Sequence, residues 1–514
     1  MTYNHNKSFF NQGSCMKRTV IPSGAAVAIA AALMFSAAAG AQTARIALGT
    51  TVNTLDPHMT ASVGTDLSVL SHIYPALVLR GPDLKLQPEL ATSWQAVNDT
   101  TWRFTLRSGA KFADGEPLDA QAVKWNLDRV RDPKVNARIK AWFTQVSDVK
   151  VISPTELEVV TASPYPGFVD QISMFLLLPP KWADSHNPAT ETLSGGRYVL
   201  TENVPGDHLT LKANPDFFGA KPAFDTVEFR IIPESASRIA ALLAGEVSLI
   251  TGIPTAELAR INQSGKAEAG SVPSMRSVMI KFNTEQAPLD NKTVRQALNY
   301  AVDKNAISQV LFDGQAPVSQ CQVLTPSYFG YNPALKAYDY NPDKARQLLK
   351  QSGADLSRSI TLDVPSGTYL QGNEVAQVVA AQLGEVGLKV NINQLEFSSY
   401  MNKYLKTREL APTSLLAQAW PTLDADGLLT LFAPGNNYAY WNHAGFGQAL
   451  ADGRAGIDPA KRLAAYRQAT EMMCDEAPVI FLYAQPATYG VAKNVRWAKR
   501  GDDWVRAFDL TPAQ

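Results

Sequence analysis

Residues 360–392 read ITLDVPSGTYLQGNEVAQVVAAQLGEVGLKVNI and switch between two hydrophobic periods. The first five residues form a short apolar and β-branched run that is typical of a buried strand. Gly387 is suited to end a helix, and Leu388, Val390 and Ile392 alternate as a following strand would. This order of strand, helix and strand predicts a parallel βαβ unit. Between the two strands, apolar residues recur at helical spacing, at Val375, Val378, Val379, Leu383 and Val386.

A second unit of the same kind lies far upstream, in residues 226–250. Residues 226–232 read as a strand, and Ser235 could cap a helix that Gly245 would end. Residues 247–250 then read as the next strand, and the apolar face of the helix carries Ile239, Leu242 and Leu243. Two α/β cores so far apart in one chain predict an α/β protein of two lobes that face each other across a cleft.

The segment between the two units, residues 281–312, begins extended, turns at Pro288 and enters a helix that Asp290 could cap. The predicted buried face of this helix is Val294, Ala297, Leu298, Ala301, Ile307 and Val310. We expect the chain to cross between the lobes at Phe282 and Asn283, which would act as the hinge, and to return near 484–491. This predicts lobe I at 42–283, lobe II at 284–485 and a C-terminal return to lobe I at 486–514.

A third, more β-like block begins with TWRFTLR, residues 101–107, in which Trp102, Phe104 and Leu106 share one face of a strand. Asp114-Gly115 is a turn signal, and Asp119 can cap a helix that starts directly after it. We therefore expect a β-rich subdomain inserted into lobe I at about 85–195.

The front of the chain resembles a secretion signal. Lys17 and Arg18 precede an uncharged apolar run over residues 24–39, and Ala39-Gly40-Ala41 offers small residues for cleavage before Gln42. We expect residues 1–41 to be removed, with Met16 as an alternative start. The apolar run is shorter than the roughly 20 residues of a membrane span. Because Cys15 lies before that run, we expect a free periplasmic protein rather than a lipoprotein.

The composition excludes some classes of protein. Lys+Arg and Asp+Glu number 47 each, so nothing indicates a nucleic-acid partner. Two cysteines, Cys321 and Cys474, remain after cleavage, and they are either a disulfide, which the periplasm permits, or two buried thiols. Neither cysteine has a C-x-x-C partner and the 6 histidines are scattered, so we expect no metal and no cofactor.

The run WRFTLRSGAKFADGEPLDA, residues 102–120, resembles the signature of family 5 of the extracytoplasmic solute-binding proteins, the peptide, nickel and opine group. Further similar motifs are Leu55-Asp56-Pro57, SGGRYVL (194–200), ANPDFFG (213–219), VRQALNYAVDK (294–304) and DEAPVIFLY (475–483). The resemblance implies two α/β lobes with a β-rich subdomain, and two crossing strands that act as a hinge. It also implies capture of a small molecule or short peptide for an ABC permease and its ATPases, by a protein that we expect to be a monomer.

The resemblance also suggests where the ligand binds. Trp420 would form a wall of the cleft, and peptide-binding relatives carry an acid shortly after it that pairs with the peptide amino group. That position is Leu423 here, so Asp424 or Asp426 would have to replace it. The alternative is that these aspartates cap the helix expected near Leu428.

Other positions bear on the kind of ligand. Thr368 stands where related peptide binders often carry an arginine, so Thr368 and Tyr369 could hydrogen-bond a ligand but could not neutralise a carboxylate. Trp142 resembles a cleft tryptophan of nickel-binding relatives, or it belongs to the core. Tyr438 could stack on a ligand, or it packs within a strand. A peptide, an opine, a glutathione-like compound or another modified solute all remain candidates.

Two functions of other classes compete with transport. No G-x-S-x-G, H-E-x-x-H, P-loop or G-x-G-x-x-G motif occurs in the chain, so we do not expect an enzyme. A carrier of ligands to a chemosensory receptor would share every sequence feature described above.

Overall fold

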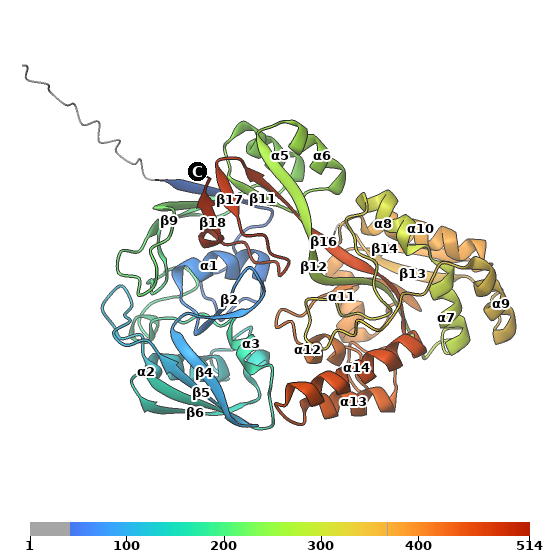
Figure 1. Cartoon of the computed structure of the whole chain (residues 1–514), viewed down its shortest axis with the longest axis horizontal. Coiled ribbons are helices and arrows are strands. Elements are labelled where there is room, and N and C mark those ends of the chain that lie inside the picture. The colour runs from blue at the N-terminus through green and yellow to red at the C-terminus, as the bar shows by residue number, and fades with distance from the viewer. Residues whose placement is uncertain (1–41, 367, 514) are drawn as a thin grey trace, which may run out of the picture. The chain divides into compact units, whose positions relative to one another are not determined.

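The computed structural model describes residues 42–366 and 368–513. The expected secretion signal, residues 1–41, lies outside the described residues. Among the described helices, none is both long and apolar enough to cross a membrane. One sheet of 10 strands runs through both lobes in the order β14-β13-β15-β12-β16-β11-β1-β10-β9-β8 (Figure 1).

Lobe I contains the part of this sheet that runs from β11 through β1 to β8. β10 and β11 both pair in parallel with β1, and helix α5 connects them, as the 226–250 pattern predicts. Its core also includes Trp504 and Leu510 from the C-terminal return. The elements of lobe I are β1 (Thr43–Leu48), η1 (Val63–Leu67), α1 (Ser68–Ile73), β8 (Tyr198–Val204), β9 (His208–Ala213), β10 (Thr226–Ile231), α5 (Ser235–Ala244), β11 (Leu249–Thr251), α6 (Thr255–Gln263), β17 (Val495–Trp497), η4 (Ala507–Asp509) and β18 (Leu510–Pro512).

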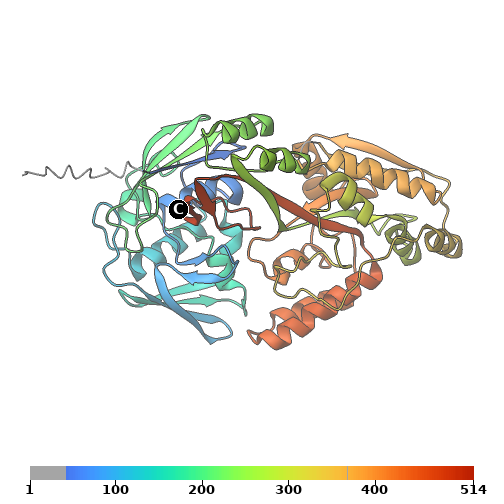
Figure 2. The same ribbon diagram turned by 45° about the horizontal axis from the view of Figure 1, so that its top comes forward.

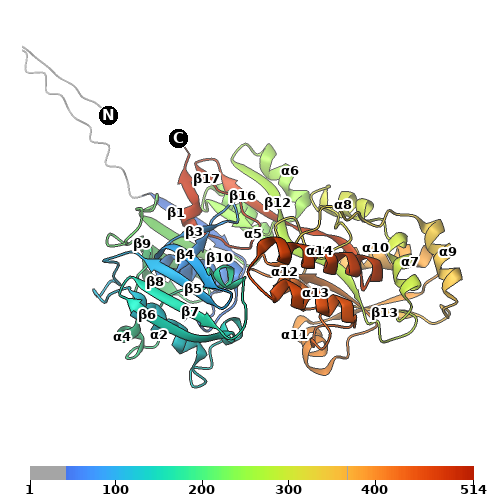
Figure 3. The same cartoon turned by 60° about the horizontal axis from the view of Figure 1, so that its bottom comes forward.

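A β-rich subdomain with its own core is inserted between β1 and β8 (Figure 3). Its antiparallel sheet has the order β4-β5-β7-β6. Asp119 caps α2 by accepting hydrogen bonds from the Gln121 and Ala122 amides, as predicted. The elements are β2 (Val78–Arg80), β3 (Leu86–Pro88), β4 (Ala91–Asn98), β5 (Thr101–Leu106), α2 (Ala120–Arg131), η2 (Lys140–Phe143), β6 (Val146–Ser153), β7 (Glu156–Thr161), α3 (Phe168–Ile172) and α4 (Pro180–Ala183).

Lobe II has a core on each face of its part of the sheet. Because side chains alternate along a strand, Val278 and Ile280 of β12 enter one core and Met279 enters the other. β13 and β14 pair in parallel around α10, which confirms the βαβ unit predicted for 360–392. The elements are α7 (Lys292–Ala301), α8 (Lys304–Phe312), α9 (Pro342–Ser352), β13 (Ile360–Pro365), α10 (Gly372–Glu385), β14 (Val390–Leu395), α11 (Phe397–Asn402), η3 (Lys403–Thr407), β15 (Thr413–Gln418), α12 (Ala425–Thr430), α13 (Ala444–Arg454) and α14 (Pro459–Glu476).

Two long antiparallel strands, β12 (Ala267–Phe282) and β16 (Val479–Ala492), belong to both lobes (Figure 2). Before Pro273, β12 pairs only with β16, whereas from Ser277 onward it also pairs with β15 of lobe II. The register shifts between these two residues, so β12 leaves lobe I there. This corrects the crossing expected at Phe282 and Asn283: Phe282 pairs with Thr413, and the Asn283 amide donates to the Pro412 carbonyl, 2.8 Å away.

The segment after β12 differs from its prediction as a single helix. Asn291, not Asp290, caps α7, and Asp303 caps a separate helix, α8. The break at Val302 changes the helical phase, so Val310, predicted to be buried, is 76% exposed. In α5 the cap position is Glu234 rather than Ser235, and it makes no side-chain capping bond. Local capping signals therefore predicted where these helices start to within one or two residues. They did not predict which face of the second helix is buried.

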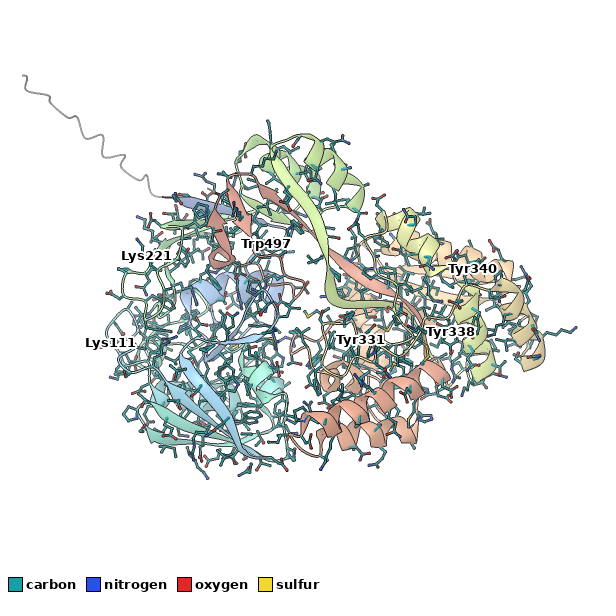
Figure 4. The ribbon with its side chains drawn as sticks, viewed as in Figure 1. Lys111, Lys221, Tyr331, Tyr338, Tyr340 and Trp497 are labelled. Carbon is teal, nitrogen blue, oxygen red and sulfur yellow. A yellow bond between two sulfur atoms is a disulfide. The ribbon has the colours of Figure 1, made fainter. Side chains whose placement is uncertain are left out.

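Cys321 and Cys474 form a disulfide within lobe II, with an S–S distance of 2.05 Å. Tyr338, labelled in Figure 4, donates its hydroxyl to the Cys474 carbonyl oxygen at 2.8 Å. The two cysteines are 153 residues apart in the chain. Closing so long a loop lowers the entropy of the unfolded chain. In the loop-closure model, this stabilises the folded protein by about 5 kcal/mol.

Candidate functional site

A cavity of about 550 Å³ lies where the two lobes and the two crossing strands meet. Ligand sites for small molecules commonly have volumes of about 300–1,000 Å³. Lobe I, the crossing strands and lobe II all contribute walls. Lobe I provides residues 61–64, 251–252, 497, 500 and 503–505, the crossing strands provide 275–276 and 485–488, and lobe II provides 370, 419 and 421.

Arg276 and Asp503 form an ion pair in the wall of this cavity. Arg276 lies within the register shift of β12, between Pro273 and Ser277, and its Nη2 donates to Asp503 Oδ2 at 2.9 Å. The two side chains keep 30% and 33% of their surface exposed, so neither is fully enclosed by protein. The Met275 amide donates to the Gly501 carbonyl at 3.0 Å, which fixes the strand against the C-terminal return beside this pair.

Arg500, the other charged residue of the described cavity wall, is already neutralised. Its side chain is 0% exposed and donates to Asp502 and Asp509 at 2.6–2.9 Å, and to the Arg80 carbonyl. A fully buried guanidinium with two carboxylate partners is a structural group. Any charge on a ligand would therefore face Arg276 and Asp503.

Two buried polar atoms of cavity residues hydrogen-bond no described residue: Gln485 Oε1 and Trp497 Nε1. Trp497 lies at the lobe I end of the crossing strands (Figure 4). One atom accepts and the other donates, and leaving such groups unpaired costs about 1–3 kcal/mol each. Buried polar atoms in a cavity wall are typical of a site that binds a polar molecule.

The lobes also touch beside this cavity, around a second cavity of about 470 Å³. Arg80 of the β-rich subdomain donates to Asp170 Oδ1 at 2.6 Å and to the Thr422 carbonyl of lobe II at 3.0 Å. Leu84 of the subdomain packs against a lobe II core. The two lobes are therefore in direct contact across the cleft.

Asp424, the leading candidate for an amine anchor, already has partners. It caps α12 by accepting from the Asp426 amide at 2.9 Å, and its Oδ2 accepts from Arg462 Nη2 at 2.6 Å. Its side chain is 7% exposed and faces the second cavity, not the first. Asp426 is paired with Arg454. Asp424 therefore caps a helix, which is the alternative role predicted for it, although the helix begins at Ala425 rather than near Leu428.

Trp420 and Tyr438 pack against the same lobe II core. The Trp420 amide donates to the Tyr328 hydroxyl at 2.7 Å, and its indole lies so close to Gly427 that a Cβ there would be 1.9 Å from the ring. The Tyr438 ring meets Tyr404 edge-on at 5.4 Å. Neither lines the main cavity, although the neighbours of Trp420, Ala419 and Pro421, do.

The remaining candidates lie at the edge of the site or away from it. Thr368 is exposed and donates to the Ser366 carbonyl at 3.2 Å. Tyr369 packs on a lobe II core next to Leu370, which lines the cavity, and burial raises the pKa of its hydroxyl. Trp142 packs between the cores of lobe I and the subdomain. Of these three, only Tyr369 lies near the cavity.

Sequence reasoning missed Arg276 and Asp503, which are 227 positions apart. No local period or motif joins residues so distant. The one available signal was local: Asp503 and Trp504 stand in RGDDWVR, residues 500–506, a segment of the C-terminal return in which charged residues surround an aromatic one.

Comparison with known proteins identifies the family of this chain. The family model of the bacterial extracellular solute-binding proteins, family 5 (middle), matches residues 85–440. The chain belongs to this family. The predicted fold is confirmed as well, because solved structures of two-lobed binding proteins match this family 5 protein over most of its length.

Three relatives show the extent of the similarity. The glutathione-binding protein GsiB of Escherichia coli K12 is 28% identical over 502 residues, which cover 93% of this chain and 96% of that protein. The ABC transporter substrate-binding protein CtaP of Listeria monocytogenes is 21% identical, with a TM-score of 0.83 over 92% of this chain and 100% of that chain. DppA of Helicobacter pylori, solved with the peptide STSA, is 22% identical, with a TM-score of 0.77 over 92% and 98%.

Proposed function

We propose that this family 5 protein is the substrate-binding component of an ABC importer and captures a short peptide or a peptide-like solute. The observation that carries the proposal is the 550 Å³ cavity, whose walls come from both lobes and both crossing strands. A solute in this cavity would touch every part that moves when the lobes close. Membership of the family and the peptide and glutathione ligands named for its relatives support this solute class.

The hinge of the proposed closure lies at Pro273–Ser277 of β12 and Ala484–Pro486 of β16. The register shift of β12 falls between these residues, and Pro273 pairs with Pro486. Hinges absorb backbone rotation where the regular pairing is interrupted. Phe282 and Asn283, which lie inside lobe II, would move with that lobe. The contact of Arg80 with the Thr422 carbonyl would hold the closed form.

The remaining parts of the proposal rest on the sequence pattern at the front of the chain and on the family. Residues 1–41 would direct secretion and be removed before Gln42, which would release a periplasmic protein without a lipid anchor. The closed form would dock as a monomer on the permease, and cytoplasmic ATPases would power uptake. Thr368 offers no positive charge for a peptide carboxylate, so a conventional dipeptide would not be held at both charged ends through this position. The glutathione ligand named for one relative supports a glutathione-like compound as the alternative solute.

The test is to purify the mature protein without denaturation, identify any released solute by mass spectrometry, and titrate that solute back. We expect small-angle X-ray scattering to show a smaller radius of gyration at saturation, because a ligand that bridges both lobes favours closure. At a concentration of about 100 times Kd, the free energy of unfolding should rise by about 2.7 kcal/mol. An unchanged radius of gyration in the presence of a bound solute would contradict capture by closure.

A further inference from the structure

We propose that Arg276 and Asp503 together recognise a zwitterionic α-amino-acid head group, in which the ammonium and the carboxylate are attached to one carbon. The proposal rests on the proposed function, because it specifies the solute that the main cavity holds. It predicts a preference for solutes linked through a side chain, such as γ-glutamyl peptides, over ordinary α-linked peptides.

The first step of the argument is that the ion pair has unused hydrogen-bonding capacity. Within the described part of the chain, Arg276 donates side-chain hydrogen bonds only to Asp503, through Nη2, and Asp503 accepts this bond at Oδ2 alone, which leaves its Oδ1 without a partner among the described residues. A guanidinium carries five N–H donors, and a carboxylate accepts at both oxygens. Donors for a carboxylate and acceptors for an ammonium are therefore available side by side in the cavity wall.

The second step is the distance between those two positions. Arg276 Nη2 and Asp503 Oδ2 are 2.9 Å apart. In an α-amino acid, standard bond lengths place the nitrogen and a carboxylate oxygen about 2.5–3 Å apart, so one head group can meet both partners at once. The termini of an extended peptide are separated by about 3.3–3.6 Å for each residue, so they cannot both reach this pair.

The third step is the absence of a second charged anchor. Arg500, the other described charged residue that lines the main cavity, is enclosed by Asp502 and Asp509. Asp424 lines the second cavity instead. An α-linked peptide would have to leave one terminus without a charged partner, which is costly in a closed site. A γ-linked peptide also leaves its C-terminal carboxylate without a charged partner, but it pairs both head-group charges, whereas an α-linked peptide pairs only one terminus with Arg276 or Asp503. In the tail, Trp497 Nε1 can donate to a carboxylate or carbonyl oxygen, and Gln485 Oε1 can accept from an amide N–H.

The positions of the two residues connect head-group binding to closure. Arg276 lies within the register shift of β12, in the proposed hinge, and Asp503 belongs to the C-terminal return on lobe I, where its carbonyl lies near Gly64 of the same lobe. Asp503 has φ of 64°, a left-handed conformation that aspartate and asparagine tolerate better than most residues. Asp503→Asn should therefore keep the backbone while removing the negative charge.

The experiment compares two isomers, γ-Glu-Ala-Gly and α-Glu-Ala-Gly, by calorimetric titration of the dialysed mature protein. They contain the same atoms, and only the γ isomer keeps the ammonium and carboxylate on one carbon. We expect the γ isomer to bind at least about 10-fold more tightly. Arg276→Met and Asp503→Asn should each weaken the γ isomer by at least about 10-fold and weaken the α isomer by less, since the α isomer can pair only one terminus with this ion pair.

The matched control is Arg45→Met. Arg45 forms an ion pair of similar exposure with Glu228, at 3.2 Å, and does not line the cavity, so both affinities should be unchanged. Thermal unfolding of each variant shows whether it is folded. If either cavity variant is unfolded, Arg276→Lys, which keeps the charge but not the fork, should still weaken the γ isomer.

Equal affinity for the two isomers, or tighter binding of the α isomer, would overturn the head-group proposal and leave the proposed function intact, since a peptide still binds. A preference for the γ isomer that survives in both cavity variants would show that the ion pair is only structural. If neither isomer binds, the head-group proposal is also overturned. In that case, the solute that copurifies shows whether the proposed function survives, and its complete absence counts against both.

Discussion

Replacing Lys281 with methionine is expected to stabilise the protein by about 3 kcal/mol at pH 6, and by less than about 1 kcal/mol near pH 10. Lys281 is 2% exposed, and no described carboxylate lies within ion-pair distance. Its Nζ faces the rings of Phe432, Tyr404 and Tyr440, at 4.5, 5.2 and 5.7 Å from their centroids. Burial, followed by the charge of Arg408, lowers the pKa of Lys281 to about 7.

The direction of the pH dependence follows from the protons bound in each state. In the unfolded chain Lys281 keeps its proton up to its ordinary pKa of 10.5, whereas in the folded protein it loses it near pH 7. Below pH 7 both states are protonated, and folding bears the full cost of burying the charge. Between pH 7 and 10.5 the unfolded state binds more protons, so stability rises with pH. Methionine removes this dependence.

The substitution should leave no polar group without a partner. Lys281 Nζ donates to the Tyr404 hydroxyl at 3.0 Å and to the Tyr438 carbonyl. The Tyr404 hydroxyl also donates to the Tyr438 carbonyl, and it accepts from Gln418 Nε2 at 3.1 Å. These bonds remain when the ammonium is gone.

The comparison for this prediction is Lys304→Met. Lys304 is also buried, with its pKa lowered to about 8, but its Nζ donates to three carbonyls, those of Asn299, Val302 and Tyr338. Its loss should destabilise the protein by about 1–3 kcal/mol. Urea unfolding at pH 6, 7.5 and 9 measures both variants against the parent. A Lys281→Met variant that is less stable than the parent at pH 6 would contradict the argument.

The sequence predicted the parts of the fold that depend on neighbouring residues. The apolar period of residues 360–392 located β13, α10 and β14, and Gly245 ends α5 with φ of 78°, because only short-range geometry is involved. The change of lobe along β12 has no such signature. The strand is buried throughout from Ser277 to Phe282, and its change of partners depends on β15, which comes much later in the chain.

The candidate site was less predictable for the same reason. The pattern at Trp420 located the correct loop, since Ala419 and Pro421 line the cavity. It could not show which acids are already neutralised, because Arg462 and Arg454 reach Asp424 and Asp426 from other helices. Which charged groups are enclosed by partners and which still face a cavity is a tertiary property that a local pattern does not carry.

Arg462→Met is expected to destabilise the protein by about 3–5 kcal/mol, because it leaves the carboxylate of Asp424 buried without its counter-charge. Asp424 and Arg462 have side chains 7% and 9% exposed, and they are 2.6 Å apart. Asp424→Asn should cost less, because an amide oxygen can still cap α12, and Arg462 keeps the Gly453 carbonyl, at 3.1 Å, and the Phe329 ring. The double variant should be more stable than the sum of the two changes predicts, by about 1–3 kcal/mol.

Arg454→Met, at the end of α13, provides the control, because its partner Asp426 lies in the first turn of the helix that Asp424 caps, α12. Arg454 pairs with Asp426, but these side chains are 40% and 30% exposed, so the loss should be below about 1 kcal/mol. Urea unfolding measures all four variants, and titration of the copurified solute measures their affinities. Since Asp424 faces the second cavity, Asp424→Asn should bind that solute within about 3-fold of the parent. A loss of affinity of about 10-fold or more with stability unchanged would instead make Asp424 the amine anchor that its place after Trp420 suggests.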